Sequence, residues 1–210
     1  GDGFRDSTEA FCLNNVVAHS DIYNPWANGI TFSGKAHACL IEHNQFHGMA
    51  DGSGPNYPRS GISLTVSGCV VRYNDVYGNG RFGITLEGRP FNGYNMDGRS
   101  NHIYHNTFWN NAGGGVQLIQ KKDGTVAGNV IENNIFWNIV PLAGDAQSNA
   151  IIAELYHSNA SRSWPDGSFN GNIVRSNLLP TGTRPVTIVR KNGSVHVTLA
   201  EAESTFDGWT

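Results

Sequence analysis

The strongest constraint on the fold is an eight-residue pattern that occurs six times in the sequence. In each copy the second and seventh residues are apolar, and the fifth is asparagine or serine. A short second segment follows each copy, for example GITL at 83–86. The six copies are VVAHSDIY (16–23), LIEHNQFH (40–47), VVRYNDVY (70–77), HIYHNTFW (102–109), VIENNIFW (130–137) and IVRSNLLP (173–180).

The spacing between the copies varies, although their internal pattern does not. The fifth residues stand at 20, 44, 74, 106, 134 and 177, which gives spacings of 24, 30, 32, 28 and 43 residues. A β-propeller or a leucine-rich repeat keeps a tighter period, whereas a solenoid of short strands collects insertions in its loops. We therefore predict an all-β parallel β-helix of about six to seven coils, which occupies residues 1–190 of a single domain.

In such a solenoid each residue lies on its counterpart in the next coil, about 4.8 Å away. The second residues then form one interior column, the seventh residues form another, and the second segments supply a third. The asparagine is predicted to lie at a bend with positive φ, where its amide bonds the amides above and below it. The glycine that opens most of the second segments is predicted to allow another sharp corner.

The C-terminal residues predict a hairpin and a short helix within the same domain, with the second hairpin strand and the helix in residues 191–210. Asn192-Gly193 is a favoured two-residue turn, and it separates two runs of alternating residues within 186–198. Thr198 with Glu201 forms a capping-box pattern, which predicts a helix from about 199 to 206. Such a helix covers a sheet edge that otherwise invites strand addition. Because the sequence also begins and ends abruptly, we expect a piece of a longer protein.

The repeated pattern resembles the right-handed parallel β-helix superfamily, which includes pectate lyase-like proteins, alginate and chondroitin lyases and polygalacturonases. The resemblance covers roughly residues 11–190 and rests on structural positions. It implies a right-handed solenoid and a secreted or cell-surface protein that acts on a polysaccharide. The residues typical of polygalacturonases are absent, since the sequence has no Asp-Asp, no Gly-His-Gly and no Arg-Ile-Lys.

Charge and hydropathy narrow the range of partners. The net charge is −3, so the sequence does not predict the basic surface that a nucleic-acid-binding protein needs. No apolar run approaches the ~18 residues of a membrane span, and the first residues lack the basic and apolar regions of a signal peptide. We expect a monomer whose partner is a polysaccharide.

Candidate site residues come from the second segments, whose outward side chains share one face of the solenoid. Solenoids bind ligands along such a face and between inserted loops, and insertions at 49–60, 89–101 and 157–172 are predicted to wall a groove here. Aromatic residues of these loops either bind sugar or hold the loops on the solenoid. The predicted catalytic residues are Lys121, Glu87, Glu154, Arg89 and His157. The predicted substrate-binding residues are Tyr94, Gln117, Lys122, Tyr156 and Trp164.

Two reactions fit these residues. A polysaccharide lyase needs a base that removes the proton next to a uronate carboxylate and cations that stabilise the developing charge. A glycoside hydrolase needs two carboxyl groups across the bond, and Glu87 and Glu154 are predicted to lie two coils apart, roughly 9–10 Å, near the inverting range. Each glutamate could instead be a solvated charge or a partner of Arg89 or Lys121. We favour the lyase, with the hydrolase and a non-catalytic carbohydrate-binding module as alternatives.

No metal-ligand pattern is predicted, although Ca²⁺ stays an alternative because related lyases use it. Within residues 11–190, four aspartates precede a glycine, which is first of all a turn signal. They are Asp51, Asp97, Asp123 and Asp166.

Three smaller expectations follow from the stacking of coils. His19, His43 and His105 share a column, and ring stacking explains it better than a transition-metal site. Glu42 next to Arg72 predicts an ion pair between coils. Cys39 and Cys69 stack, but neighbours on parallel strands rarely have the right side-chain directions, so we predict free thiols.

Overall fold

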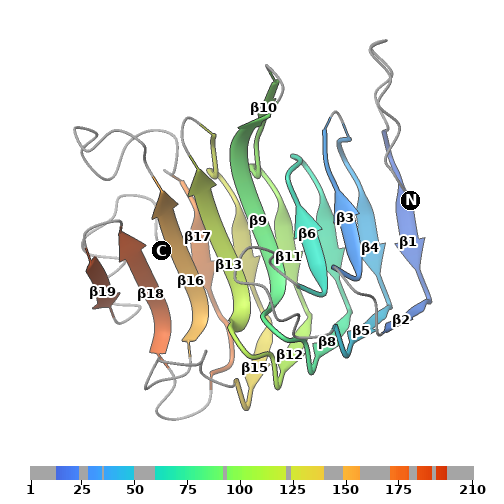
Figure 1. Cartoon of the computed structure of the whole chain (residues 1–210). Coiled ribbons are helices and arrows are strands. Elements are labelled where there is room, and N and C mark those ends of the chain that lie inside the picture. The colour runs from blue at the N-terminus through green and yellow to red at the C-terminus, as the bar shows by residue number, and fades with distance from the viewer. Residues whose placement is uncertain are drawn as a thin grey trace.

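The structure is a computed structural model, and it describes residues 13–23, 28–34, 36–49, 60–91, 94–121, 124–139, 149–156, 171–179, 184–190 and 193–197. Within these ranges the chain forms strands and no helix. The strands lie side by side along one axis, from β1 near the N-terminus to β19 near the C-terminus (Figure 1). The predicted number of coils stays a prediction, because several loops lie outside these ranges.

Three sheets make up the walls of the solenoid. The first sheet contains β1 (Val16–Ala18), β4 (Leu40–Glu42), β7 (Val70–Arg72), β11 (His102–Tyr104), β14 (Val130–Glu132) and β17 (Ile173–Arg175). The second sheet contains β2 (Asp21–Tyr23), β5 (Gln45–His47), β8 (Asp75–Tyr77), β12 (Thr107–Trp109) and β15 (Ile135–Trp137).

The third sheet is formed by the second segments of the repeat. It contains β3 (Ile30–Phe32), β6 (Ile62–Leu64), β9 (Phe82–Phe91), β13 (Gly114–Lys121), β16 (Asn149–Tyr156), β18 (Arg184–Arg190) and β19 (Gly193–Val197). β10 (Tyr94–Met96) pairs with the end of β9.

The predicted interior columns are confirmed by the strand register. Val17 pairs with Ile41 and Ile41 with Val71 in the first sheet, and the seventh residues of the repeat pair in the same way in the second sheet. Every pairing between successive coils is parallel, whereas β18 and β19 are antiparallel. The core contains stacked apolar side chains from all three sheets, such as Phe108 on Phe136 with ring centroids 5.0 Å apart.

The asparagine ladder is confirmed, but the predicted position of the positive φ is wrong by one residue. Nδ2 of Asn74 donates to Oδ1 of Asn106 at 2.9 Å, and Nδ2 of Asn106 donates to Oδ1 of Asn134 at 3.0 Å. Each amide also reaches the previous coil, as when Asn106 donates to the Val71 carbonyl. Positive φ belongs to the residue before each asparagine, such as Tyr73 at 55°. At this turn the Tyr73 ring stays outside the solenoid, and the side chain of the following asparagine points into the interior.

Two further ladders occupy other corners and escaped the sequence analysis. Nδ2 of Asn101 donates to Oδ1 of Asn129 at 3.0 Å, and Asn129 donates in turn to Asn172 at 2.9 Å. Asn79 donates to Asn111 at 2.8 Å. In the sequence, each of these asparagines lies five residues before or after an asparagine of the predicted ladder. The two further ladders therefore follow the same register between coils as the predicted one. All five are buried, and the ladders satisfy polar groups that would otherwise destabilise the corners.

The glycines that open the second segments are needed for space rather than for a turn. A Cβ on Gly83 would lie 2.6 Å from the Phe108 ring and 2.7 Å from the Gly115 carbonyl. A Cβ on Gly29 would lie 2.6 Å from the Gly61 carbonyl. Only glycine allows the backbones of neighbouring coils and the interior rings to approach this closely.

The C-terminal hairpin is present as β18 and β19. Gly193 pairs with Arg190 as the first residue of β19, so it belongs to the strand and not to the turn. The predicted capping helix lies outside the described residues.

Several of the smaller expectations are confirmed. The Arg72 guanidinium pairs with Glu42 at 2.8 Å, and the rings of His19 and His43 stack with centroids 5.1 Å apart. Cys39 is a buried free thiol, as is Cys69. Burial raises the pKa of Cys69 to about 12.

Candidate functional site

A cluster of charged side chains lies on the outer face of the third sheet, where β9 and β13 extend beyond the shorter strand β6. Side chains alternate along a strand, so the inward direction of Leu86 sends Glu87 and Arg89 outward from β9. Lys121 is the last residue of β13 and points to the same side. We call Glu87, Arg89 and Lys121 the charged cluster.

The cluster consists of two cations held by one carboxylate. Nζ of Lys121 lies 3.0 Å from Oε1 of Glu87, and Nε of Arg89 lies 3.6 Å from the same oxygen. The Glu87 side chain is 5% exposed, whereas those of Lys121 and Arg89 are 37% and 38% exposed. Glu87 therefore lies next to two cationic side chains that are each partly exposed. Of the three side chains, two are cationic and one is anionic.

The backbone around Glu87 is packed too closely for any side chain larger than glycine at three positions. A Cβ on Gly98 would lie 3.0 Å from the Glu87 nitrogen, and a Cβ on Gly88 would lie 2.4 Å from the Thr125 carbonyl oxygen. A Cβ on Gly124 would lie even closer to its neighbour, 2.1 Å from the Gly88 carbonyl carbon. The Glu87 side chain is 5% exposed beside this packed backbone. Because an unpaired buried carboxylate is costly, its ion pairs with Arg89 and Lys121 offset that cost.

The insertion at 89–101 was predicted as a loop, and the structure shows that part of it forms an antiparallel strand pair. β9 continues to Phe91, and β10 returns antiparallel beside it, with Met96 opposite Arg89. Tyr94, a predicted substrate-binding residue, opens β10 and pairs with Phe91. The hairpin extends the third sheet at the coil that carries the charged cluster (Figure 1).

The outward row next to the charged cluster is buried, so the prediction of an open groove along it is not met in the central coils. The hydroxyls of Ser60 and Thr85 lie 2.7 Å apart, and Thr85 donates to Oε1 of Gln117 at 3.1 Å. Gln117, a predicted substrate-binding residue, is 1% exposed. Thr31, in an outer coil, is exposed. The sequence shows which side chains point outward, but it does not show what covers them.

The register places two further candidates beside the cluster. Glu154 in β16 pairs with Ile119, which pairs with Glu87, so the two glutamates lie in one row two strands apart. Tyr156 pairs with Lys121. The remaining candidates lie outside the described residues; they are His157, Lys122 and Trp164.

No group of three or more histidine, cysteine or acidic residues that could hold a metal is found in the described part of the chain. Asp97 is the one Asp-Gly aspartate within it. Its carboxylate accepts a hydrogen bond from the Thr125 backbone at 3.1 Å and lies 3.6 Å from Nε of Arg99. Asp97 thus holds two neighbouring segments together.

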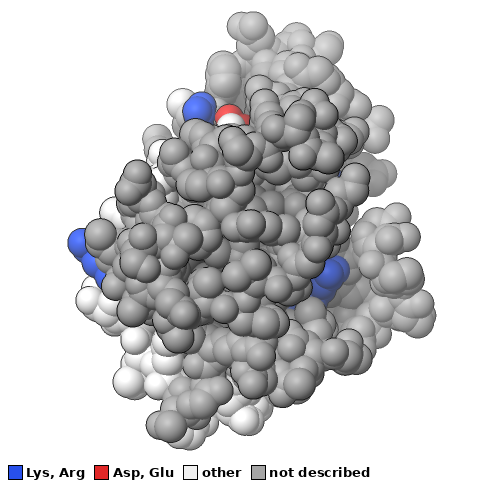
Figure 2. Space-filling view, turned by 90° about the vertical axis from the view of Figure 1, so that its left-hand side faces the viewer, with Lys and Arg blue, Asp and Glu red and all other residues white. Residues whose placement is uncertain are grey.

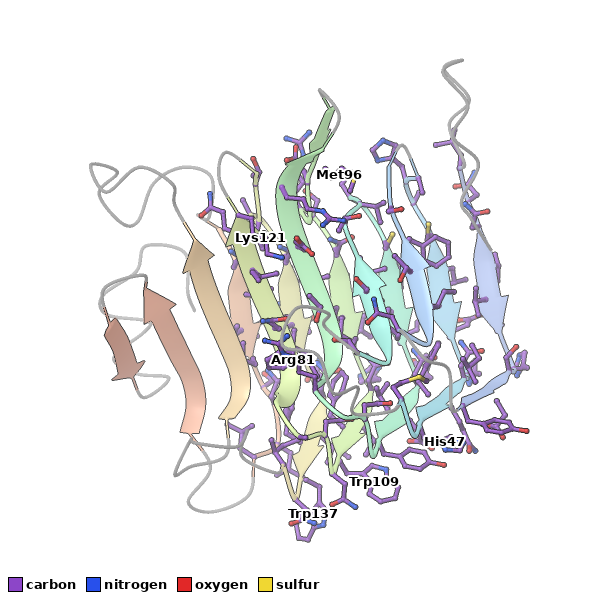
Figure 3. All side chains as sticks on the ribbon, in the orientation of Figure 1. His47, Arg81, Met96, Trp109, Lys121 and Trp137 are labelled. Atoms are coloured by element: carbon purple, nitrogen blue, oxygen red, sulfur yellow. The ribbon has the colours of Figure 1, made fainter. Side chains whose placement is uncertain are left out.

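A second group of side chains was missed by the sequence analysis. The third residue of each strand in the second sheet is aromatic or histidine, and the first four of these side chains stack on the outside of the solenoid. The signal was visible, because these residues end the first five copies of the repeat. In Figure 3, Trp109 and Trp137 lie along the lower edge, far from Lys121 near the upper edge. We call this row the aromatic ladder; its members are Tyr23, His47, Tyr77, Trp109 and Trp137.

Seen from the C-terminal end, the described basic residues form separate spots and no continuous stripe (Figure 2). One spot lies next to an acidic group. No helix within the described ranges is long and apolar enough to cross a membrane.

The stacked parallel sheets define a parallel β-helix with a charged cluster on one wall and an aromatic ladder on another. The family model described as a right-handed β-helix region matches residues 14–206, and the chain belongs to this family. No curated protein matches the chain. Among solved structures, the crystal structure of the Dettilon tailspike protein is similar over 84% of this chain, with 18% sequence identity and a TM-score of 0.48. The match spans 39% of the length of that tailspike chain.

Proposed function

We propose that the protein binds an acidic polysaccharide at the charged cluster and cleaves it by β-elimination. The supporting observation is that Arg89 and Lys121, each more than a third exposed, are held together by the buried carboxylate of Glu87. Two fixed cations with a net positive charge suit a uronate carboxylate, which an arginine can bind through two parallel hydrogen bonds.

The chemical roles in this proposal follow from the pairing. Nζ of Lys121 lies 3.0 Å from the Glu87 carboxylate in an ion pair, which suits it to stabilise negative charge rather than to accept a proton. Lys121 and Arg89 would hold the uronate carboxylate and the charge that develops when the neighbouring proton is removed. Tyr156, one strand further at the position of Lys121, is the proposed base. His157 is the alternative base.

The hydrolase alternative is less well supported. An inverting hydrolase needs one carboxylic acid and one carboxylate facing the bond. Glu87 is buried and paired with two cations, and Ile119 separates it from Glu154 in the same row. Neither feature suits a proton donor that must reach a glycosidic oxygen.

A panel of uronate-containing and neutral polysaccharides tests the proposal. Unsaturated uronates absorb in the ultraviolet, so a lyase gives new absorbance, whereas a hydrolase gives reducing ends without it. The assay is run with added Ca²⁺ and with a chelator. We expect new absorbance with at least one uronate polymer and none with neutral ones. Reducing ends without absorbance, or retention on a glycan gel with neither signal, would contradict the proposed chemistry.

Variants connect the activity to the cluster. We expect Lys121→Met to weaken binding of the acidic polymer by about tenfold or more, because a charge-assisted hydrogen bond contributes roughly 1.5–3 kcal/mol. Tyr156→Phe should retain binding and lose turnover. Arg99→Met is the matched control, because Arg99 is an exposed arginine paired with Asp97 outside the cluster. An equal loss in Arg99→Met would contradict a specific role for the charged cluster.

A further inference from the structure

Four of the five side chains of the aromatic ladder, from Tyr23 to Trp109, form a continuous stack on the outer face of the second sheet. Ring centroids lie 5.6 Å apart from Tyr23 to His47, 4.7 Å from His47 to Tyr77 and 4.3 Å from Tyr77 to Trp109. The planes of these neighbouring rings differ by 12°, 5° and 8°. Trp137 follows in the register as the partner of Trp109. The inner rings therefore cover one another's faces and present mainly their edges to solvent.

Trp137 differs from the inner rings because it ends the ladder. It is 62% exposed, and no other described ring follows it in the row. Ile135, two residues earlier, is also exposed, as is Leu178, which forms a bridge with Ile135. The labelled side chains of Trp109 and Trp137 point away from the body of the solenoid (Figure 3). An exposed indole in an apolar surrounding is a surface on which a ligand can stack.

An amide pair lies directly beside the two indoles. Asn110 follows Trp109 and Asn138 follows Trp137, both with positive φ, at 53° and 45°. Nδ2 of Asn138 donates to Oδ1 of Asn110. This bond leaves Nδ2 of Asn110 as a donor and Oδ1 of Asn138 as an acceptor, neither of which bonds another described residue. One donor and one acceptor next to an exposed ring match the needs of a sugar, which has apolar C–H faces and hydroxyl groups.

The charges near the ladder decide which sugars suit it. β12 and β15 contain no charged residue, and the outward charges nearest to them in the sheet are Asp75 and Asp21. Asp21 pairs with His47 at 2.9 Å. An acidic polymer would meet only negative charge along this sheet, whereas a neutral sugar meets uncharged rings and amides.

We infer that Trp137, with Trp109 and the Asn110–Asn138 amide pair, forms a second carbohydrate site that binds neutral sugar units. The indole of Trp137 stacks on the apolar face of the sugar ring, and the amide pair bonds its hydroxyls. A second copy of the chain is the weaker occupant, because a stable interface buries about 800 Å² on each partner and only three large apolar side chains among the described residues of this surface are exposed. The site shares no residue with the charged cluster, so either site can fail without the other.

Calorimetric titration with neutral hexasaccharides of glucose, xylose and N-acetylglucosamine tests this site, with a uronate hexasaccharide as comparison. We expect at least one neutral oligosaccharide to bind. Trp137→Ala should weaken it by about tenfold or more, and Trp137→Phe should stay within about threefold, since a stacking interaction contributes on this scale. Asn138→Ala should weaken binding by several-fold. Lys121→Met should leave it unchanged.

Tyr73→Ala is the matched control, because Tyr73 is an exposed stacked ring of the neighbouring corner column. Absence of binding by every neutral oligosaccharide at millimolar concentration would overturn the inference. An equal effect of Trp137→Ala and Tyr73→Ala would also overturn it. A dimer that Trp137→Ala converts to a monomer, measured by sedimentation, would assign the surface to contact between copies instead.

Discussion

The charged cluster and the aromatic ladder occupy different walls of one solenoid and arise in opposite ways. The ladder repeats one kind of residue at one position in five strands, and its spacing follows from the coil register. The cluster uses Glu87, Arg89 and Lys121, which have no counterparts of the same type in the outer coils. It lies where β9 and β13 are longer than their neighbours and a hairpin is inserted.

This difference indicates where chemistry can arise in a repetitive fold. A repeated column is stabilised by its own neighbours, since each ring or amide satisfies the next one. Like charges on adjacent strands repel, so Arg89 and Lys121 lie on neighbouring strands only with the Glu87 carboxylate beside both of them. We therefore expect functional residues where the repeat is interrupted, and an open stacking surface where a repeated column ends.

The largest expected effect comes from the asparagine ladder, on which both regions depend. Asn106→Ala removes the acceptor of the backbone N–H and Nδ2 of Asn74 and the donor to Val71. We expect the free energy of unfolding to fall by about 3 kcal/mol, because several buried polar groups lose their partners. Urea unfolding measures it, with Thr107→Ala as the control, because Thr107 follows Asn106 as the half-buried first residue of β12 and does not take part in the ladder. A loss under about 1 kcal/mol would show that the ladder does not hold the coils together.

Within the aromatic ladder, we expect the inner rings to stabilise the fold and the ring at the exposed end to bind the ligand. Trp109 is half-buried and stacks on Tyr77 at 4.3 Å, so Trp109→Ala should lower the free energy of unfolding by about 2 kcal/mol. Trp137→Ala, at the exposed end, should change it by less than about 0.5 kcal/mol. Thermal or urea unfolding of both variants compares them. Equal losses would mean that the end of the ladder is as structural as its middle.

Salt should distinguish the two sugar sites. Raising the NaCl concentration from about 0.05 to 0.5 M should weaken acidic oligosaccharide binding by about tenfold, because exposed charges are screened. Neutral oligosaccharide binding should change by less than about twofold, since no charged group contributes to it. Titrations at both salt concentrations test this difference. If the two affinities fall by the same factor, the prediction is wrong.

The smallest effect concerns the first sheet, which contributes to neither region. Hydrogen bonds from Arg175 and then His102 lower the pKa of Glu132. A carboxyl whose pKa is lowered by folding stabilises the fold above its unfolded pKa, and this contribution is lost as the pH falls through the folded pKa. We expect Glu132→Gln to cost up to about 1 kcal/mol at pH 7, and this cost should disappear as the pH falls through the folded pKa of Glu132. The affinities for the acidic and for the neutral oligosaccharide should both stay unchanged. A change in either affinity would show that the first sheet is coupled to one of the proposed sugar sites.

Much of the interior could be predicted because it repeats. Six copies of one pattern identified the interior columns and one asparagine ladder, and all of these are present. The φ prediction failed because positive φ was expected at asparagine, whereas here histidine and tyrosine adopt it so that the asparagine can point inward. The ladder through Asn101 was missed because Cys39 and Cys69 occupy the same column in earlier coils.

The exterior could be predicted only in part. Alternation along the second segments correctly placed Glu87, Arg89 and Lys121 on one face. The burial of Glu87 and Gln117 could not be predicted, since it depends on how insertions fold over the sheet. The aromatic ladder was overlooked because aromatic residues were sought in the loops, although five copies of the repeat end in tyrosine, histidine or tryptophan.

Central to the proposed function is that two chemically different sugar surfaces lie on separate walls of this solenoid. Amide chemical shifts of the labelled protein, recorded with a uronate and then with a neutral oligosaccharide, test it most directly. We expect the acidic ligand to shift the signals of residues 87–89 and 119–121, and the neutral ligand to shift those of 109–110 and 137–138. Shifts of the same residues with both ligands, or of neither set, would contradict the claim.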